Sequence, residues 1–197
     1  MTTFESPFMQ SDVNRPRRVI LISAVGAPAA WMLGGLAGCG NRADQEDRQL
    51  SFMSLADAET ELARLAAAKT LNSAAKWTWA ETLVHCAQSI EYSMTGYPQQ
   101  KSKLFQSTVG PAALGFFAWR GRMSHDLAEP IPGAPALPAQ ADPVAALARL
   151  RAAMLGFLTW DKPLQPHFAY GELDKKAYER AHAMHIANHL SQFQLAA

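Results

Sequence analysis

Apolar side chains at helical spacing are the feature that most constrains how this chain can fold. From about residue 51 onward they recur at steps of three and four residues in stretches rich in Ala and Leu. The alternation of Val, Ile and Thr that is typical of β-strands is nearly absent. The sequence therefore predicts an all-α domain, and 197 residues suffice for one core of ordinary size, or for one core and a leader.

The same spacing predicts four principal helices and one extra helix. We expect helices beginning at Ser54, over about 77–94, over about 105–122, from Asp142-Pro143 and from about Asp174. Gly110-Pro111 interrupts the third of these, so that this helix is expected to begin properly at Pro111. Two long proline-bearing links, over 124–141 and 162–172, separate the later helices. The expected architecture is a helical bundle with crossover connections.

The first 39 residues have the features of an export signal. Arg17 and Arg18 precede an uncharged run over 19–37, and the run ends in Leu36-Ala37-Gly38-Cys39. This ending resembles the bacterial lipobox, in which Cys39 would be lipidated, and the arginine pair resembles an imperfect twin-arginine signal. A retained membrane anchor is the alternative, which Pro28 and five nearby glycines disfavour.

These features predict three segments: a signal peptide over 1–39, a polar tether over 40–50 and a helical domain over 51–197. The protein would be an exported lipoprotein, anchored in a membrane on the periplasmic side or at the cell surface, with the twin-arginine route favoured.

The composition bears on the expected partners. With a formal net charge of +1, the chain lacks the excess of positive charge that is typical of nucleic-acid-binding proteins, so no nucleic-acid partner is expected. We expect the protein to bind a small molecule. The sequence does not decide whether the chain forms a homodimer. Cys86 is expected to be a small buried residue rather than a reactive thiol.

Three histidines lie on one stripe of the last expected helix. His182, His185 and His189 are spaced by three and four residues, so their rings point the same way as the apolar Ile186. An inward imidazole without a partner is costly. The three rings therefore either hydrogen-bond to one another or hold a metal.

The helix over 77–94 supplies a fourth histidine, His85. Gln88, Ser89 and Tyr92 lie near it on a face without lysine or arginine. We interpret this face as the wall of a polar cavity, with an ordinary exposed face as the alternative. If His85 faces His185 and His189, three imidazoles surround one point, an arrangement found in zinc sites that keep an open position.

Other candidates carry weaker signals. Glu81 and Glu91 are candidates for an acid or base, although Glu91 points away from His85 by about a third of a turn. His125 and His167 lie in loops, where ordinary surface or hinge residues are expected and the gating of a ligand is the alternative. Three tryptophans are expected to pack in the core: Trp77, Trp79 and Trp119.

Several strings in the sequence resemble the DinB-like (DinB/YfiT) superfamily of metal-binding four-helix bundles. They are His85-Cys86-Ala87-Gln88 after Trp77-Thr78-Trp79, and His185-x3-His189-x2-Gln192. The fuller strings over 85–93, 120–123 and 130–135 resemble an uncharacterised-domain branch of that superfamily. There, a histidine on the second helix and an HxxxH pair on the last helix bind a divalent metal.

The resemblance implies a DinB-like four-helix bundle in which His85, His185 and His189 are the metal ligands, with His182 as an alternative ligand. Imidazole ligands suit zinc, nickel, copper or iron. The best-understood members of the superfamily transfer groups to or from small thiols in the cytoplasm, a setting that differs from an exported lipoprotein.

Two classes of function follow. One is a metal-dependent hydrolase or transferase acting on a small molecule at the open position of the metal. The other is a non-catalytic binding or structural lipoprotein that contains a structural metal or a hydrogen-bonded histidine cluster.

Overall fold

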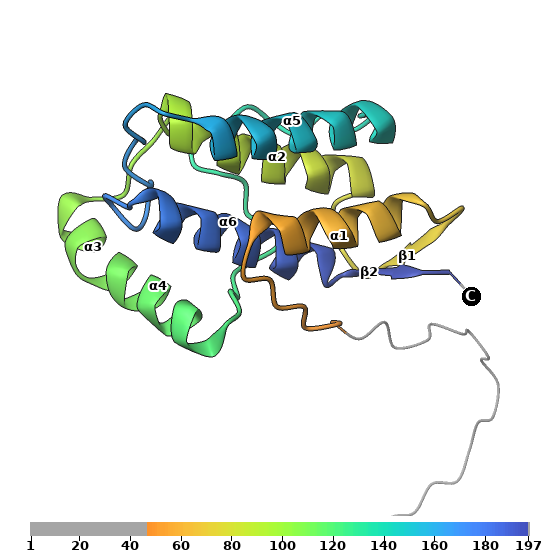
Figure 1. Cartoon of the computed structure of the whole chain (residues 1–197), viewed down its shortest axis with the longest axis horizontal. Coiled ribbons are helices and arrows are strands. Elements are labelled where there is room, and N and C mark those ends of the chain that lie inside the picture. Colours follow the sequence, from red (N-terminus) through yellow and green to blue (C-terminus); the bar gives the residue numbers. More distant parts are fainter. Residues whose placement is uncertain (1–46, 197) are drawn as a thin grey trace, which may run out of the picture. The chain divides into compact units, whose positions relative to one another are not determined.

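The computed structural model describes residues 47–196 (Figure 1). The expected signal peptide over 1–39, including Cys39, and most of the tether over 40–50 lie outside the described residues. The described part is mostly helical, with six helices and one two-stranded sheet, which confirms the all-α class. Within residues 47–196, no helix is long and apolar enough to cross a bilayer.

Four long helices supply most of the core, and each begins at a residue whose side chain accepts a hydrogen bond from the first turn. They are α1 (Leu55–Ala66), α2 (Trp79–Thr95), α5 (Pro143–Thr159) and α6 (Lys175–Leu190). The capping residues are Ser54, Thr78, Asp142 and Asp174. The helix starts expected at Ser54, Asp142 and Asp174 are confirmed.

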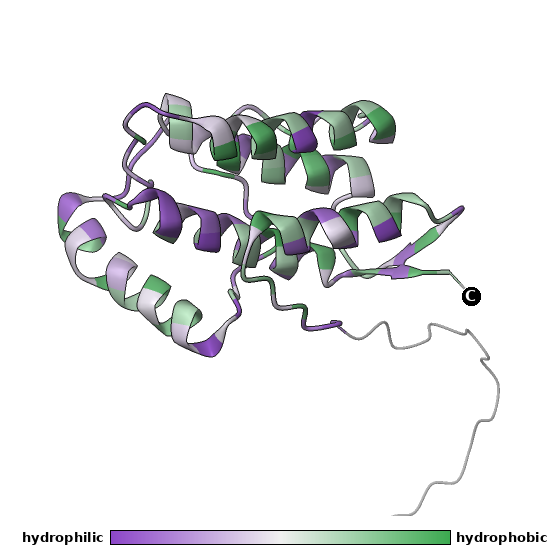
Figure 2. Cartoon of the chain, viewed as in Figure 1, coloured by the Kyte–Doolittle hydropathy of each residue, from purple (hydrophilic) through white to green (hydrophobic). Residues whose placement is uncertain are grey.

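These four helices pack in pairs. α2 runs along α5, α1 runs along α6, and α2 also contacts α6 (Figure 1). Figure 2 shows that α1 and α5 mix hydrophobic and hydrophilic residues along their length, as helices with one inward face do. The largest fully buried side chains of the shared core include Leu62, Leu83, Ile90, Leu150, Phe157, Tyr178 and Ile186.

One residue of α5 departs from its expected place. Apolar residues at helical spacing would put Val144 in one inward stripe with Leu150, but Val144 is 76% exposed. Six residues at 3.6 residues per turn place Val144 about 120° from Leu150 around the helix axis. The stripe that packs inward therefore begins later along the helix.

The segment expected to form one interrupted helix is divided into α3 (Lys103–Ser107) and α4 (Val109–Arg120). The break falls at Thr108 and not at Gly110-Pro111. Pro111 lies in the first turn of α4. Backbone N–H groups in the first turn have no acceptor within the helix, so a proline there costs no hydrogen bond and the helix can begin before it. α4 contacts α6, and Trp119 near its end is 81% exposed, so the expectation that Trp119 packs in the core is wrong.

A short sheet was not expected from the sequence. β1 (Leu71–Ser73) pairs antiparallel with β2 (Phe193–Leu195), with Leu71 opposite Leu195 and Ser73 opposite Phe193. The pairing ties the segment after α6 to the connection between α1 and α2. The two long links lie between α4 and α5 and between α5 and α6, as expected.

Candidate metal centre

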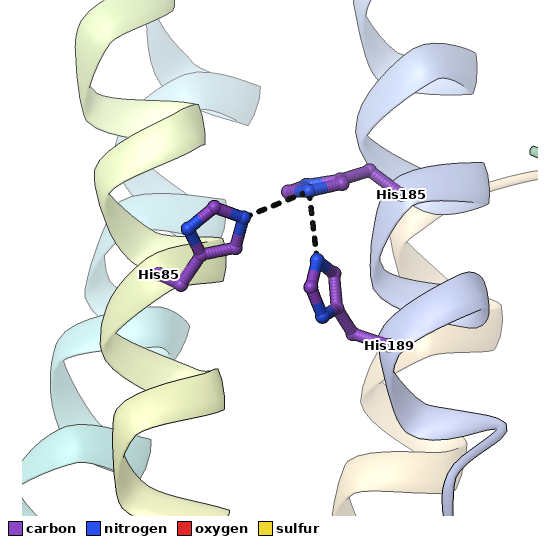
Figure 3. A group of neighbouring side chains, drawn as sticks. All are labelled: His85, His185 and His189. Atoms are coloured by element: carbon purple, nitrogen blue, oxygen red, sulfur yellow. Dashed lines mark hydrogen bonds between the residues drawn. The ribbon is translucent and has the colours of Figure 1, made fainter. Parts of the chain in front are cut away.

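Helices α2 and α6 bring His85, His185 and His189 together (Figure 3). The Nε2 atom of His185 lies 3.2 Å from the Nε2 atom of His85 and 3.2 Å from that of His189. One nitrogen from each ring lies within 4.8 Å of the others, which is close enough for the three rings to hold one metal ion. The structure thus brings together three residues that the sequence singled out.

The local structure of each helix explains this placement. The hydroxyl of Thr78 accepts a hydrogen bond from the Glu81 N–H, and the Glu81 carboxylate accepts one from the Thr78 N–H, which fixes the start of α2 two turns before His85. On α6, His185 and His189 are one turn apart and share a face. The contact between α2 and α6 then places His85 opposite the pair.

The three rings lie in an environment that favours neutral imidazoles. His85 and His189 are buried and His185 is half-buried. Burial, followed by the neighbouring His125, lowers the pKa of His85 to about 3. Burial also lowers the pKa of His185 and of His189 well below the ordinary value, and the neighbouring histidines add to this effect. Neutral rings have free lone pairs, which is the form that binds metals.

His182 lies apart from this group of three. Its ring stacks on Tyr178, with the ring centroids 5.4 Å apart, and meets Phe157 edge-on at 5.2 Å. It is three residues from His185 on the same helix, but its nitrogen atoms do not belong to the group of ligand atoms that lie within 4.8 Å of one another. Burial lowers the pKa of His182 to about 3.

A cavity of about 140 Å³ opens beside the cluster. This volume is comparable to that of a protein cavity that holds one benzene molecule. Five of the six histidines line it, together with aromatic, apolar and charged side chains. The histidines are His85, His125, His167, His182 and His185.

The face of α2 that we interpreted as a cavity wall contributes only part of this lining. Ser89 lines the cavity, whereas Gln88 and Tyr92 are not among the lining residues. Gln88 is buried, and the ring of Tyr92 instead contacts the ring of Tyr97 at 5.8 Å. The rest of the wall comes from the two long links, from α6 and from Lys101 in the connection between α2 and α3.

His125 and His167 were expected to be ordinary surface or hinge residues, but both line the cavity, so the expectation of ordinary surface residues is wrong for them. The ring of His125 lies 5.2 Å from the rings of His185 and His189. His167 is buried, and its Nδ1 accepts hydrogen bonds from the N–H groups of Ala169 and Tyr170. Its proton therefore resides on Nε2, which makes His167 a fixed donor. The only signal in the sequence was a histidine inside a long link.

Neither glutamate candidate lines the cavity. Glu81 caps α2, and Glu91 forms an ion pair with Arg149 at 2.6 Å. Among the residues that line the cavity, the carboxylate is that of Glu129, an exposed residue of the link between α4 and α5.

Two other expectations concern residues near the cluster. Cys86 is fully buried, and burial raises the pKa of its thiol to about 12, which agrees with an unreactive side chain. Trp77 packs against the site rather than in the main core: its ring lies 4.7 Å from that of His85 and stacks on that of His189 at 5.8 Å.

Comparison with known protein families finds one match, which covers residues 44–195, most of the chain. The matching family is described as "protein of unknown function (DUF1569)". The chain belongs to the DUF1569 family. Comparison with curated proteins and with solved structures finds no match. The matched range contains all the helices and strands of the structure, and the description of the family names no activity.

Proposed function

We propose that this DUF1569 domain binds one divalent metal ion through His85, His185 and His189 and presents it to a small molecule in the adjoining cavity. The observation that supports the proposal is the convergence of three buried or half-buried Nε2 atoms beside a cavity of about 140 Å³. Zinc, nickel and iron are the candidate metals, because imidazole suits all three.

The donor chemistry favours a metal over a hydrogen-bonded histidine cluster. The Nε2 atom of His185 is 3.2 Å from two other Nε2 atoms. An imidazole nitrogen has either one N–H or one in-plane lone pair, so it forms one well-directed hydrogen bond and cannot satisfy both neighbours. A metal satisfies all three at once. Two nitrogens at the usual zinc distance and the tetrahedral angle are about 3.3 Å apart, close to the observed separation.

Such a metal would act as a Lewis acid and would activate a bound water or substrate atom. The residues of the chain would do the rest. His167 offers its Nε2–H to an acceptor atom of the ligand, and Glu129 is the carboxylate available to move a proton. This arrangement supports a metal-dependent hydrolase or transferase for a molecule of about benzene size.

We also propose that the fold is a four-helix bundle of the DinB-like type, formed by α1, α2, α5 and α6. The support is that the histidine on the second long helix and the HxxxH pair on the last long helix lie together, where the resemblance to that superfamily puts the ligands.

A non-catalytic lipoprotein with a structural metal is the alternative. One observation favours it: the two glutamates that the sequence offered as acid or base are engaged elsewhere, in a helix cap and in an ion pair. In that case a small anion would not alter the metal site.

Metal analysis of full-length protein, purified without chelators or affinity-tag histidines, tests the metal site. We expect one metal per chain in the wild type. His185→Ala should weaken retention by about 100-fold or more, because it removes the ring whose Nε2 atom lies 3.2 Å from the Nε2 atoms of both other ligands.

The matched control is His182→Ala, which removes a buried histidine from the same cavity but not from the group of three. This variant should keep most of the metal. Stoichiometric metal in the double variant His85→Ala, His189→Ala would exclude the proposed ligand set.

We further propose that the protein is an exported lipoprotein anchored through Cys39. The support is the Leu36-Ala37-Gly38-Cys39 ending of the apolar run. Cys39→Ser should accumulate as an unprocessed precursor without lipid, as measured by metabolic labelling with a fatty acid and by membrane partition. A variant that is processed and membrane-bound like the wild type would contradict the lipobox.

A further inference from the structure

The link between α4 and α5 (residues 121–142) delivers His125 to the cluster. Met123 and Ile131, on either side of it, are buried, and the guanidinium of Arg122 donates to the side-chain carbonyl of Gln49 at 2.6 Å. The stretch that contains His125 is therefore fastened to the bundle at both ends, although it forms no helix or strand.

The ring of His125 lies almost as near the cluster as the members of the cluster lie to one another, although its nitrogen atoms are not among the ligand atoms that lie within 4.8 Å of one another. Its centroid is 5.2 Å from those of His185 and His189, and the centroids within the cluster are 4.7–5.1 Å apart. A positive charge on His125 would also lower the pKa of His85, His185 and His189, so the ring is within electrostatic reach of all three.

The hydrogen bonding of His125 fixes which nitrogen is free. Its Nδ1 lies 2.9 Å from the backbone carbonyl oxygen of Asp126. A carbonyl oxygen only accepts, so Nδ1 carries the proton and Nε2 carries the lone pair. Nε2 is buried, and no residue in the described range 47–196 hydrogen-bonds to it. An Nδ1–H held by a backbone carbonyl is a common arrangement for a histidine that binds a metal through Nε2.

We propose that His125 is a fourth protein ligand of the metal, supplied by the link, and that a small anion entering the cavity replaces it. This inference rests on the proposed three-histidine metal site. His85, His185 and His189 are fixed on packed helices, whereas His125 is held by a link that lines the cavity itself. His125 is therefore the metal ligand that can be displaced at least cost, because its ring can turn away while buried Met123 and Ile131 keep the ends of the stretch in place.

Cobalt-loaded full-length protein tests the inference, because the visible spectrum of cobalt(II) reports its donor set without any assay of activity. The informative variant is His125→Asn. Its amide N–H can still donate to the Asp126 carbonyl oxygen, so the link keeps its fastening, but no atom replaces Nε2. We expect a changed spectrum, and azide should half-saturate the variant at a concentration lower than the wild type needs by about tenfold or more, because no internal ligand competes.

His182→Ala is the matched control for the donor set and should leave the cobalt spectrum without azide as in the wild type, because His182 is outside the group of three. A second variant, His125→Ala, should regain a wild-type-like spectrum when free imidazole is added, a response that a misfolded protein would not give.

The outcomes separate the two proposals. A wild-type protein that takes up no stoichiometric cobalt overturns the metal site itself. A wild type that binds cobalt, together with a His125→Asn variant whose spectrum and azide affinity match it, overturns the role of His125 and leaves the three-histidine site standing.

Discussion

At the scale of single residues, three imidazole nitrogens are buried without a hydrogen-bond partner among the described residues. They are Nδ1 of His85, Nε2 of His125 and Nε2 of His182. Each such atom costs about 1–3 kcal/mol of desolvation free energy. All three belong to residues that line one cavity, and proteins concentrate costs of this kind at functional sites.

His167 gives a residue-scale prediction, because its Nδ1 satisfies two backbone N–H groups in a buried turn. His167→Ala should lower the free energy of unfolding by about 1–3 kcal/mol, since it leaves these N–H groups unpaired. His167→Asn should restore much of the loss, because the side-chain oxygen of Asn can accept in place of Nδ1. Urea unfolding at pH 7.5 measures both variants. If both lose the same free energy of unfolding, the hydrogen bonds accepted by Nδ1 of His167 are not the cause of the loss.

At the scale of elements, two glycines of α4 differ sharply in their surroundings. A Cβ added at Gly110 would overlap the backbone carbonyl oxygen of Ala169, whereas one added at Gly115 would meet nothing within 4 Å. Gly110 thus lets α4 rest directly on the turn that holds His167. This close approach links a peripheral helix to the wall of the cavity.

The element-scale prediction compares alanine at these two positions. Gly110→Ala should destabilise the protein by about 1–3 kcal/mol or more, because rigid backbone must move. Gly115→Ala should stabilise it by about 0.5–1 kcal/mol, because alanine favours an exposed helix interior. Thermal unfolding followed by circular dichroism measures both changes. Destabilisation of similar size at both positions would mean that the close contact is not the cause.

At the scale of the whole molecule, every histidine in the chain has a lowered pKa, and burial is the first cause in each case. The pKa values of His85, His167 and His182 fall to about 3. As the pH falls below 6.5, the unfolded chain takes up protons that the folded chain excludes. The folded state therefore loses stability from about pH 6.5 toward pH 3.

We expect the metal-free protein to be sensitive to acid for this reason. Each histidine that stays neutral in the folded state removes about 1.4 kcal/mol of stability per pH unit below 6.5. Urea unfolding of chelator-treated protein at pH 7.5, 6.5 and 5.5 should show a steep loss only in the lower interval. A free energy of unfolding that does not change between pH 6.5 and 5.5 would contradict buried, neutral histidines.

The sequence by itself determined the features that depend on neighbours along the chain. The caps at Ser54, Asp142 and Asp174 stand directly before apolar stripes at helical spacing, so the starts of three helices could be predicted. The spacing of His185 and His189 likewise places both rings on one face of any helix. The fold class and the pairing of His185 and His189 on one face of α6 are therefore local properties of the sequence.

Only the tertiary structure decided which other histidines join that pair. His182 shares the helix face but lies two turns from His189, and the position at which α2 crosses α6 selects His185 and His189 as the partners of His85. His125 and His167 lie in links without periodicity, so their places depend on how those links cross the bundle. The pairing of β1 with β2 is decided in the same way, because three-residue strands have too few positions to show an alternation.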